Sequence, residues 1–206
     1  MRGDITERVE HDKQKVAVLI YEGVYQLDFA GPMEVFTDAG LDEDAPFFDV
    51  YTVSDSTSGL RTHTGLQVTP AFSIHDCPPS DILVVPGGNS NLPAENLALA
   101  EWLRKTVPVT DIVLSVCTGA IILAKLGLLA GLEATTWHGD LDVLQAAEPT
   151  ANVRAGVRYT DNGRIITTAG ISAGIDGALH LVSRLHGPDV ARRTAEYMDY
   201  EYWKGD

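Results

Sequence analysis

Short, continuous apolar runs recur along the chain, and each ends in turn-prone residues. They occupy residues 16–20, 82–85 and 112–116. Apolar runs of about 4–8 residues are typical of strands that are covered on both faces. Each run is followed by a stretch with helical signals, so the pattern predicts alternating strands and helices. We therefore expect an α/β fold with a mainly parallel sheet between helices.

The remaining patterns complete this outline. Helices are predicted over residues 31–39, 94–105 and 118–129, and Pro32 suits the first turn of the first helix. A strand is expected at residues 47–54, and an edge ribbon around Thr64-Gly65 at residues 61–68. Asp161-Asn-Gly163 predicts a hairpin between strands at 157–160 and 165–168. Apolar positions at helical spacing then predict a helix that packs on the sheet: Ile175, Ala178, Leu179 and Val182.

Length and composition suggest one soluble domain. The 206 residues are 45% hydrophobic and 21% charged, as in ordinary globular proteins, so we expect a polar leader at residues 1–14 and a single domain at 15–206. The net charge of −14 disfavours nucleic acid and anionic membranes as partners. The polar start has no secretory signal core, and the two cysteines lack metal-ligand spacing. We expect a cytoplasmic protein without a metal site.

Ligands of parallel sheets bind at the carboxyl ends of the strands, so the residues after each run are the candidates for chemistry. Cys117 follows one apolar run and is itself followed by the small residues Thr118, Gly119 and Ala120. This pattern resembles a nucleophile elbow, in which a tight turn exposes a reactive side chain. A helix N-terminus would lower the pKa of the thiol and favour thiolate. The alternative is a small buried hydrophobic residue, as most free cysteines are.

Two further strand ends carry weaker signals. Gly87 and Gly88 follow the second run, and their N–H groups could approach an anion, although Pro-Gly-Gly is more often a plain turn. Asp28 lies just before the first predicted helix, where a capping role is the commoner explanation. Among the histidines, His138 in Thr136-Trp-His-Gly139 is nearest to a predicted strand end. Cys77, in a proline-containing loop, is interpreted as structural.

Together, four segments resemble the ThiJ/PfpI superfamily, and within it the isocyanide hydratases. The segments are Leu27-Asp-Phe-Ala-Gly-Pro32, Val85-Pro-Gly-Gly88, Ser115-Val-Cys-Thr-Gly119 and Gly170-Ile-Ser-Ala-Gly-Ile-Asp176. The resemblance implies a flavodoxin-like three-layer sandwich, like that of class I glutamine amidotransferases. It also implies a homodimer, no cofactor and the hydration of an isonitrile to an N-substituted formamide.

The resemblance also assigns roles to individual residues. Cys117 matches the family nucleophile and Asp28 the acidic residue beside it. Thr118 matches a pocket position beside the nucleophile, and Gly87 and Gly88 match positions that line the same pocket. We add His138 as a candidate substrate-binding residue.

In the mechanism that this implies, Cys117 attacks the isonitrile carbon and Asp28 protonates that carbon to give a thioimidate. Water then releases the formamide, while N–H groups of Thr118 or Gly88 stabilise the developing charge.

Two other functions remain open. One is a non-catalytic small-molecule or redox sensor, although the acidic chain end lacks the basic helix-turn-helix of regulators with this fold. The other is a glyoxalase-like activity on 2-oxoaldehydes, whose enzymes usually pair the cysteine with Glu and His.

Overall fold

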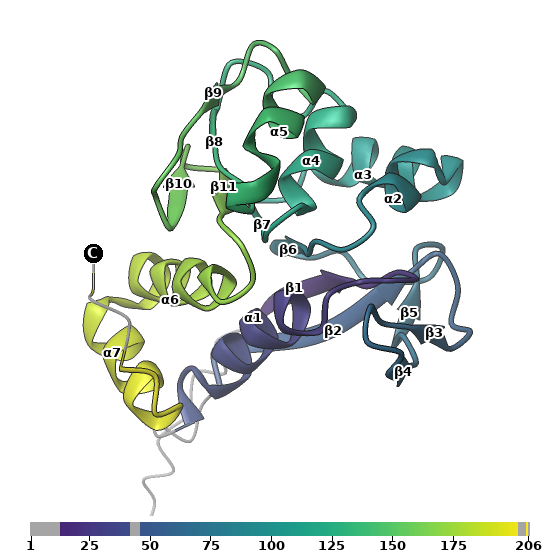
Figure 1. The fold of residues 1–206 in the computed structure, drawn as a ribbon. Coiled ribbons are helices and arrows are strands. Elements are labelled where there is room, and N and C mark those ends of the chain that lie inside the picture. The colour runs from purple at the N-terminus through teal and green to yellow at the C-terminus, as the bar shows by residue number, and fades with distance from the viewer. Residues whose placement is uncertain (1–12, 42–45, 202–204, 206) are drawn as a thin grey trace, which may run out of the picture.

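A seven-stranded sheet runs through the centre of the protein, in the order β10-β11-β7-β6-β1-β2-β5 (Figure 1). The computed structural model describes residues 13–41, 46–201 and 205. The strands of this sheet are β1 (Gln14–Leu19), β2 (Phe48–Ser54), β5 (Phe72–Ser73), β6 (Ile82–Val85), β7 (Ile112–Ser115), β10 (Tyr159–Asp161) and β11 (Ile165–Thr168). All neighbours pair in parallel except β10, which is antiparallel to β11 at the edge. The predicted mainly parallel sheet is confirmed.

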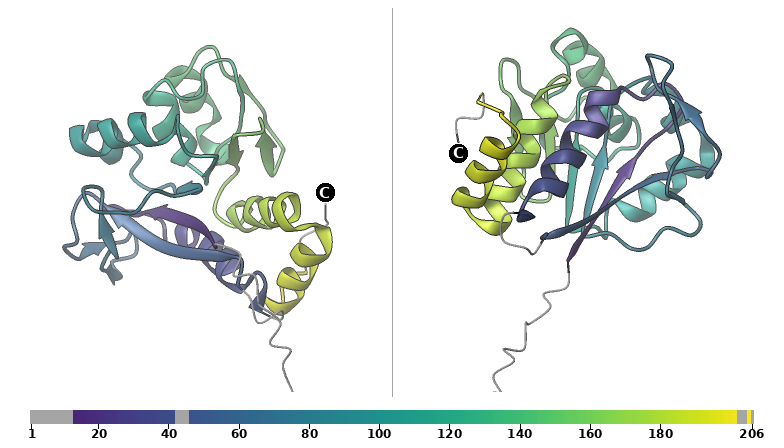
Figure 2. Two further views of the ribbon diagram at one scale, coloured as in Figure 1. Left: turned by 180° about the vertical axis from the view of Figure 1, so that it is seen from behind. Right: turned by 90° about the horizontal axis from the view of Figure 1, so that it is seen from below.

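Helices cover both faces of the sheet. One layer consists of α1 (Gln26–Asp38), α6 (Ala173–His186) and α7 (Pro188–Tyr197), which lie side by side in Figure 2. The other layer consists of α2 (Asn91–Glu95), α3 (Leu97–Thr106), α4 (Gly119–Lys125) and α5 (Leu141–Ala147). The central strands β1, β6 and β7 are buried on both faces, which explains why their sequences are continuous apolar runs. The arrangement is the expected three-layer α/β sandwich.

Two small sheets lie outside the main one. The predicted ribbon is present as β3 (Leu60–Arg61) and β4 (Gln67–Val68), paired antiparallel. The segments β8 (Glu133–Ala134) and β9 (Asn152–Val153) pair in parallel, and a short 3-10 helix, η2 (His138–Asp140), follows β8. The predicted hairpin is also present, as β10 and β11.

The first helix begins earlier than its sequence pattern suggests. We expected it to begin at residue 31, with Pro32 in the first turn, but α1 begins at Gln26 and Pro32 lies inside it. Proline there removes one backbone hydrogen bond of the helix. The helix start is held instead by tertiary contacts, because the N–H of Tyr25 donates to the carbonyl oxygen of Gly87 (3.0 Å). Asp28 therefore lies in the first turn of the helix rather than before it.

Two other predicted helices differ from the structure in their boundaries. The segment 94–105 is divided between α2 and α3, because Asn96 adopts an extended conformation and caps α3 by accepting from Ala98 and Leu99. The helix predicted at 118–129 ends at Lys125, where the chain turns through Gly127 in the left-handed region (φ 73°). No helix of the described residues is long and apolar enough to span a membrane.

The sheet order brings the candidate residues together. The neighbouring strands β1, β6, β7 and β11 are all parallel, so their carboxyl ends lie along one edge of the sheet. The helices that follow β1 and β6 cover opposite faces, which makes this the point at which α/β proteins bind ligands. Of the predicted leader, residues 1–12 lie outside the described residues, and Gln14 already begins β1.

Candidate active site

The turn after β7 has the geometry of an elbow. Cys117 adopts a left-handed conformation (φ 55°), which is uncommon for a residue other than glycine. Its N–H donates to the carbonyl oxygen of Ala169 (3.1 Å), and its own carbonyl oxygen accepts from the Thr136 hydroxyl (2.8 Å). These bonds hold the strained turn between β7 and α4. Such strain is common at functional sites, where the surrounding structure compensates for it.

Gly119 is required because the elbow folds back against β6. A Cβ atom added to Gly119 would lie 2.0 Å from the carbonyl oxygen of Val85, a backbone atom that cannot move aside. We expect Gly119→Ala to lower the free energy of unfolding by about 3 kcal/mol or more, measured by urea denaturation. Gly59→Ala is the control, since its Cβ would meet only ordinary contacts, at 3.7 Å or more. Equal stability of the two variants would contradict the close approach at the elbow.

Asp28 reaches the elbow from α1. Its side chain is fully buried, and Oδ2 accepts a hydrogen bond from the N–H of Gly87 (3.1 Å). The Cys117 thiol lies close enough to interact with this carboxyl. The second oxygen, Oδ1, has no hydrogen-bond partner among the described residues. Because a buried carboxyl oxygen without a partner is costly, Oδ1 indicates a place for a ligand or for a reacting proton.

The glycine turn after β6 completes this arrangement. A Cβ atom on Gly87 would lie 2.7 Å from both Asp28 Oδ2 and Thr118 Oγ1, so only glycine fits between them. The N–H of Gly88 donates to Thr118 Oγ1 (3.0 Å), and the same hydroxyl donates to the carbonyl oxygen of Gly88 (3.2 Å). The structure thus brings together Cys117, Asp28, Thr118, Gly87 and Gly88. The end of β6, the turn at Gly87 and Gly88, and the elbow at Cys117 thus form one site.

The chain is similar to known proteins over most of its length. Residues 14–184 match the model of the DJ-1/PfpI family. The chain belongs to the DJ-1/PfpI family. Isonitrile hydratase from Pseudomonas putida is 33% identical over 188 residues, which cover 90% of this chain and 78% of that protein. The transcriptional regulator CdhR from Pseudomonas aeruginosa is 33% identical over 152 residues, 74% of this chain but only 45% of the regulator.

Solved structures of the DJ-1/PfpI family share the fold. A ThiJ/PfpI family protein from Pseudomonas syringae superposes with a TM-score of 0.84 at 25% identity, covering 98% of this chain and 81% of that one. Drosophila melanogaster DJ-1beta superposes with a TM-score of 0.79 at 20% identity, covering 92% of this chain and 100% of that one. The flavodoxin-like architecture expected from the sequence is therefore confirmed.

The electrostatics of this DJ-1/PfpI elbow differ from the sequence-based expectation. Burial, and then the charge of Asp28, raise the pKa of Cys117 to about 12, whereas the helix N-terminus was expected to lower it. Burial also raises the pKa of Asp28, to about 6, against the opposing hydrogen bond from Gly87. Near neutral pH the pair therefore holds one proton, and that proton rests on sulfur. The thiolate forms only when the proton moves to Asp28 or to a substrate.

Two backbone groups favour that transfer. The N–H groups of Thr118 and Ile171 both hydrogen-bond to the sulfur, and each lowers the pKa of the thiol. The expected role of Thr118 and Gly88 as donors to a developing charge stays a prediction, since both N–H groups already have acceptors in the resting site. The N–H of Thr118 donates to the sulfur of Cys117, and the N–H of Gly88 donates to the hydroxyl of Thr118.

Sequence reasoning missed Ile171 and Thr136. Ile171 adopts the left-handed region (φ 49°) directly after Gly170, and its N–H faces the cysteine from the turn between β11 and α6. Its only sequence signal was its place in the glycine-rich segment that resembles the family. Thr136 carried none, because a threonine is common in any extended segment. Both residues act through contacts between distant parts of the chain.

His138 occupies a different environment from the elbow residues. It is exposed in η2, and its ring lies against Trp137, with ring centroids 5.0 Å apart. The substrate-binding role assigned to His138 stays a prediction. Among the described residues, no group of three or more His, Cys, Asp or Glu side chains could hold a metal ion. His11, interpreted with other histidines as a surface or packing residue, lies outside the described residues.

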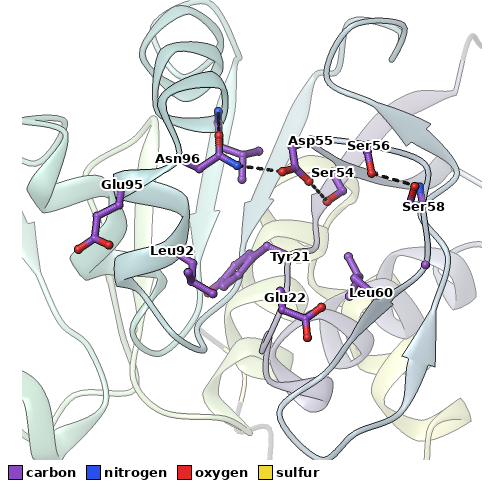
Figure 3. Close-up of a pocket in the computed structure, with 12 residues that line it drawn as sticks. Tyr21, Glu22, Ser54, Asp55, Ser56, Ser58, Leu60, Leu92, Glu95 and Asn96 are labelled. Carbon is purple, nitrogen blue, oxygen red and sulfur yellow. Dashed lines mark hydrogen bonds between the residues drawn. The ribbon is translucent and has the colours of Figure 1, made fainter.

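The structure has a pocket of about 520 Å³, and none of the residues of the elbow lines it (Figure 3). Its walls come from the ends of β1 and β2, the start of β3, and α2 and α3. Cys117 is 5% exposed and does not line this pocket, whereas Tyr21 does. Burial raises the pKa of Tyr21, and the charges of Asp28 and Cys117 raise it further. Tyr21 therefore borders the pocket and also lies within electrostatic reach of the elbow.

Proposed function

We propose that this protein is a cysteine-dependent hydratase that adds water to an isonitrile and releases an N-substituted formamide. The observation that carries the proposal is the buried pair of Cys117 and Asp28, in which thiol and carboxyl interact and Oδ1 of Asp28 has no hydrogen-bond partner among the described residues. The similarity to a hydratase of this activity over 90% of the chain supports the same reaction. Hydration of an isonitrile requires a nucleophile and a proton donor at one carbon, and this pair supplies both.

The first half of the reaction forms a thioimidate. The proton of the Cys117 thiol moves to the Asp28 carboxylate, and the N–H groups of Thr118 and Ile171 stabilise the resulting thiolate. The sulfur then bonds to the isonitrile carbon while Asp28 delivers the proton to that same carbon. The product is Cys–S–CH=N–R, and Asp28 is again a carboxylate. A pKa of about 6 suits Asp28 to both accepting and donating this proton near neutral pH.

The second half consumes water. Asp28 accepts a proton from a water molecule while the oxygen of that water bonds to the thioimidate carbon. Asp28 then passes the proton to the nitrogen. The tetrahedral adduct Cys–S–CH(OH)–NH–R then loses its hydroxyl proton to Asp28, and the C–S bond breaks. Formamide leaves, and the pair of Cys117 and Asp28 again holds one proton. The balance is one isonitrile and one water for one formamide, without an added oxidant or reductant.

The proposal is tested by incubating purified protein with an aryl isonitrile and following the formamide by chromatography. Oxygen from H₂¹⁸O should appear in the formamide. Cys77→Ala is the matched control for the cysteine chemistry, because Cys77 lies half-buried in another loop. Absence of formamide from several alkyl and aryl isonitriles would overturn the proposal.

A non-catalytic sensor is the second candidate function. The similarity to the regulator CdhR over 74% of this chain favours it. A sensor would bind a small molecule, or be oxidised at Cys117, without forming a released product. Stoichiometric modification of Cys117 without turnover would favour this function over hydration.

The proposal includes the assembly that the family resemblance implies and the location expected from the sequence. We propose a homodimer that works in the cytoplasm and uses no metal or organic cofactor. Light scattering of the purified protein measures the mass directly, and a mass near 22.2 kDa, that of one chain, would contradict the dimer. Unchanged turnover after dialysis against a chelator would support activity without a metal.

A further inference from the structure

Tyr21 is a buried polar side chain to which the proposed reaction gives no role. It follows β1 and is 3% exposed. Its hydroxyl donates a hydrogen bond to the carbonyl oxygen of Pro86 (3.1 Å). Burial, together with the charges of Asp28 and Cys117, raises its pKa well above the usual value for tyrosine. The hydroxyl therefore keeps its proton and remains a donor wherever the reaction would run.

The carbonyl that Tyr21 contacts belongs to the same peptide group that holds Asp28. The carbonyl oxygen of Pro86 and the N–H of Gly87 are the two ends of one peptide unit. Tyr21 donates to one end, and the other end donates to Asp28 Oδ2 (3.1 Å). A hydrogen bond to a peptide carbonyl polarises the unit and makes its N–H a stronger donor. The hydroxyl and the carboxyl are thus joined through a single peptide.

We infer that Tyr21 is a positioning residue, which holds and polarises the peptide between Pro86 and Gly87 so that the carboxylate form of Asp28 is favoured. Without this hydroxyl, the buried Pro86 carbonyl would lose its partner and the Gly87 N–H would become a weaker and less firmly oriented donor. The proton affinity of Asp28 would then increase. The inference rests on the proposed function only for the role that it gives to Asp28.

The other titratable groups around Asp28 do not explain this effect. Cys117 acts on the carboxyl from the elbow and stays protonated near neutral pH. On α6, which packs against α1, Asp176 is occupied by an ion pair with Arg158. Tyr21 therefore acts on Asp28 through the peptide between Pro86 and Gly87. A neutral hydroxyl carries no net charge, so the hydrogen bond is the dominant interaction.

The experiment is a ¹³C NMR titration of the aspartate carboxyl groups, with Asp28 assigned by its loss in Asp28→Asn. We expect Tyr21→Phe to raise the titration midpoint of Asp28 by about 0.3 pH unit or more. The matched control is Tyr51→Phe, because the Tyr51 hydroxyl also donates to a backbone carbonyl, that of Pro78 (2.7 Å), away from the elbow. Tyr51→Phe should leave the midpoint unchanged.

A smaller rise, no change or a fall in Tyr21→Phe would overturn the inference, as would an equal rise in Tyr51→Phe. If Tyr21→Phe does not fold, 3-fluorotyrosine placed at position 21 decides the question. This phenol is a stronger donor, so it should lower the midpoint, and an unchanged or raised midpoint would overturn the inference. The titration needs no turnover, so failure of isonitrile hydration and failure of this inference are distinguishable.

Discussion

Formamide production is expected to fall to the background rate when Cys117 is replaced by serine or alanine. The proposed bond to the isonitrile carbon needs a thiolate. A serine hydroxyl ionises far less readily than a thiol and is a much weaker nucleophile, so the serine variant should not form this bond. The loss should appear as a fall in kcat of about 10³-fold or more, measured with an aryl isonitrile at pH 7.5. Intact mass spectrometry of the wild-type protein during turnover should detect the thioimidate.

The control for this prediction is Cys77→Ser. Cys77 is half-buried in the loop after β5, and its pKa is raised mainly by burial. Its replacement should leave kcat within about twofold, because the loop lies outside the elbow. Full activity of either Cys117 variant would exclude covalent catalysis, and turnover would then need another nucleophile.

Replacing Asp28 by asparagine should lower kcat by about 10²-fold or more. Asparagine can accept the hydrogen bond from Gly87, so the turn after β6 keeps its contact, but it cannot carry the proton between sulfur, substrate and water. The thiol of Cys117 would then lose the group that takes its proton. Steady-state kinetics on isonitrile measures the loss, and a change of less than twofold would remove Asp28 from the mechanism.

The same substitution should stabilise the protein at neutral pH. Asp28 has a pKa of about 6 in the folded protein, above the value of about 3.9 for an unfolded chain. As the pH rises, the unfolded chain therefore loses this proton first, and folding stability falls between about pH 4 and pH 6. The cost reaches about 3 kcal/mol above pH 6. Urea denaturation should find Asp28→Asn more stable than the wild type at pH 7.5, but not at pH 4.

Asp76→Asn should have the opposite sign, which makes it the control for the stability measurement. Hydrogen bonds from the hydroxyl and N–H of Ser73 lower the pKa of Asp76, so its carboxylate stabilises the fold above about pH 4. This variant should lose a small amount of stability at pH 7.5. Equal pH dependence of the Asp28→Asn variant and the wild type would contradict the raised pKa of Asp28.

The fold was predictable from the sequence because the central strands are buried on both faces. Burial forces β1, β6 and β7 to be continuous apolar runs, and such runs are visible without any tertiary information. Helix boundaries were less predictable. The start of α1 at Gln26 depends on the contact between Tyr25 and Gly87, and no local pattern encodes that contact. Asn96 divides the second predicted helix, residues 94–105, by capping a new helix.

Part of the candidate site was also predictable. Cys117 stood out because an apolar run ends at it and small residues follow it, which is a local requirement of the elbow. Asp28 was chosen through the family resemblance, since its sequence position favoured a capping role. The structure gives it no such role, because its carboxyl accepts from Gly87 in another segment. Ile171 was missed, because its contact with the sulfur forms only when the turn after β11 packs against the elbow.

The sequence by itself determined the order of strands and helices and the turn that carries Cys117, because burial and tight turns restrict which residues can occupy each position. Only the tertiary structure decided where the shared proton rests. Ionisation depends on desolvation and on charged or hydrogen-bonding groups within a few ångströms, and those come from α1 and from the turns after β6 and β11 as well as from the elbow itself. The same packing turned the expected low pKa of Cys117 into a high one and joined Tyr21 to Asp28 through one peptide group.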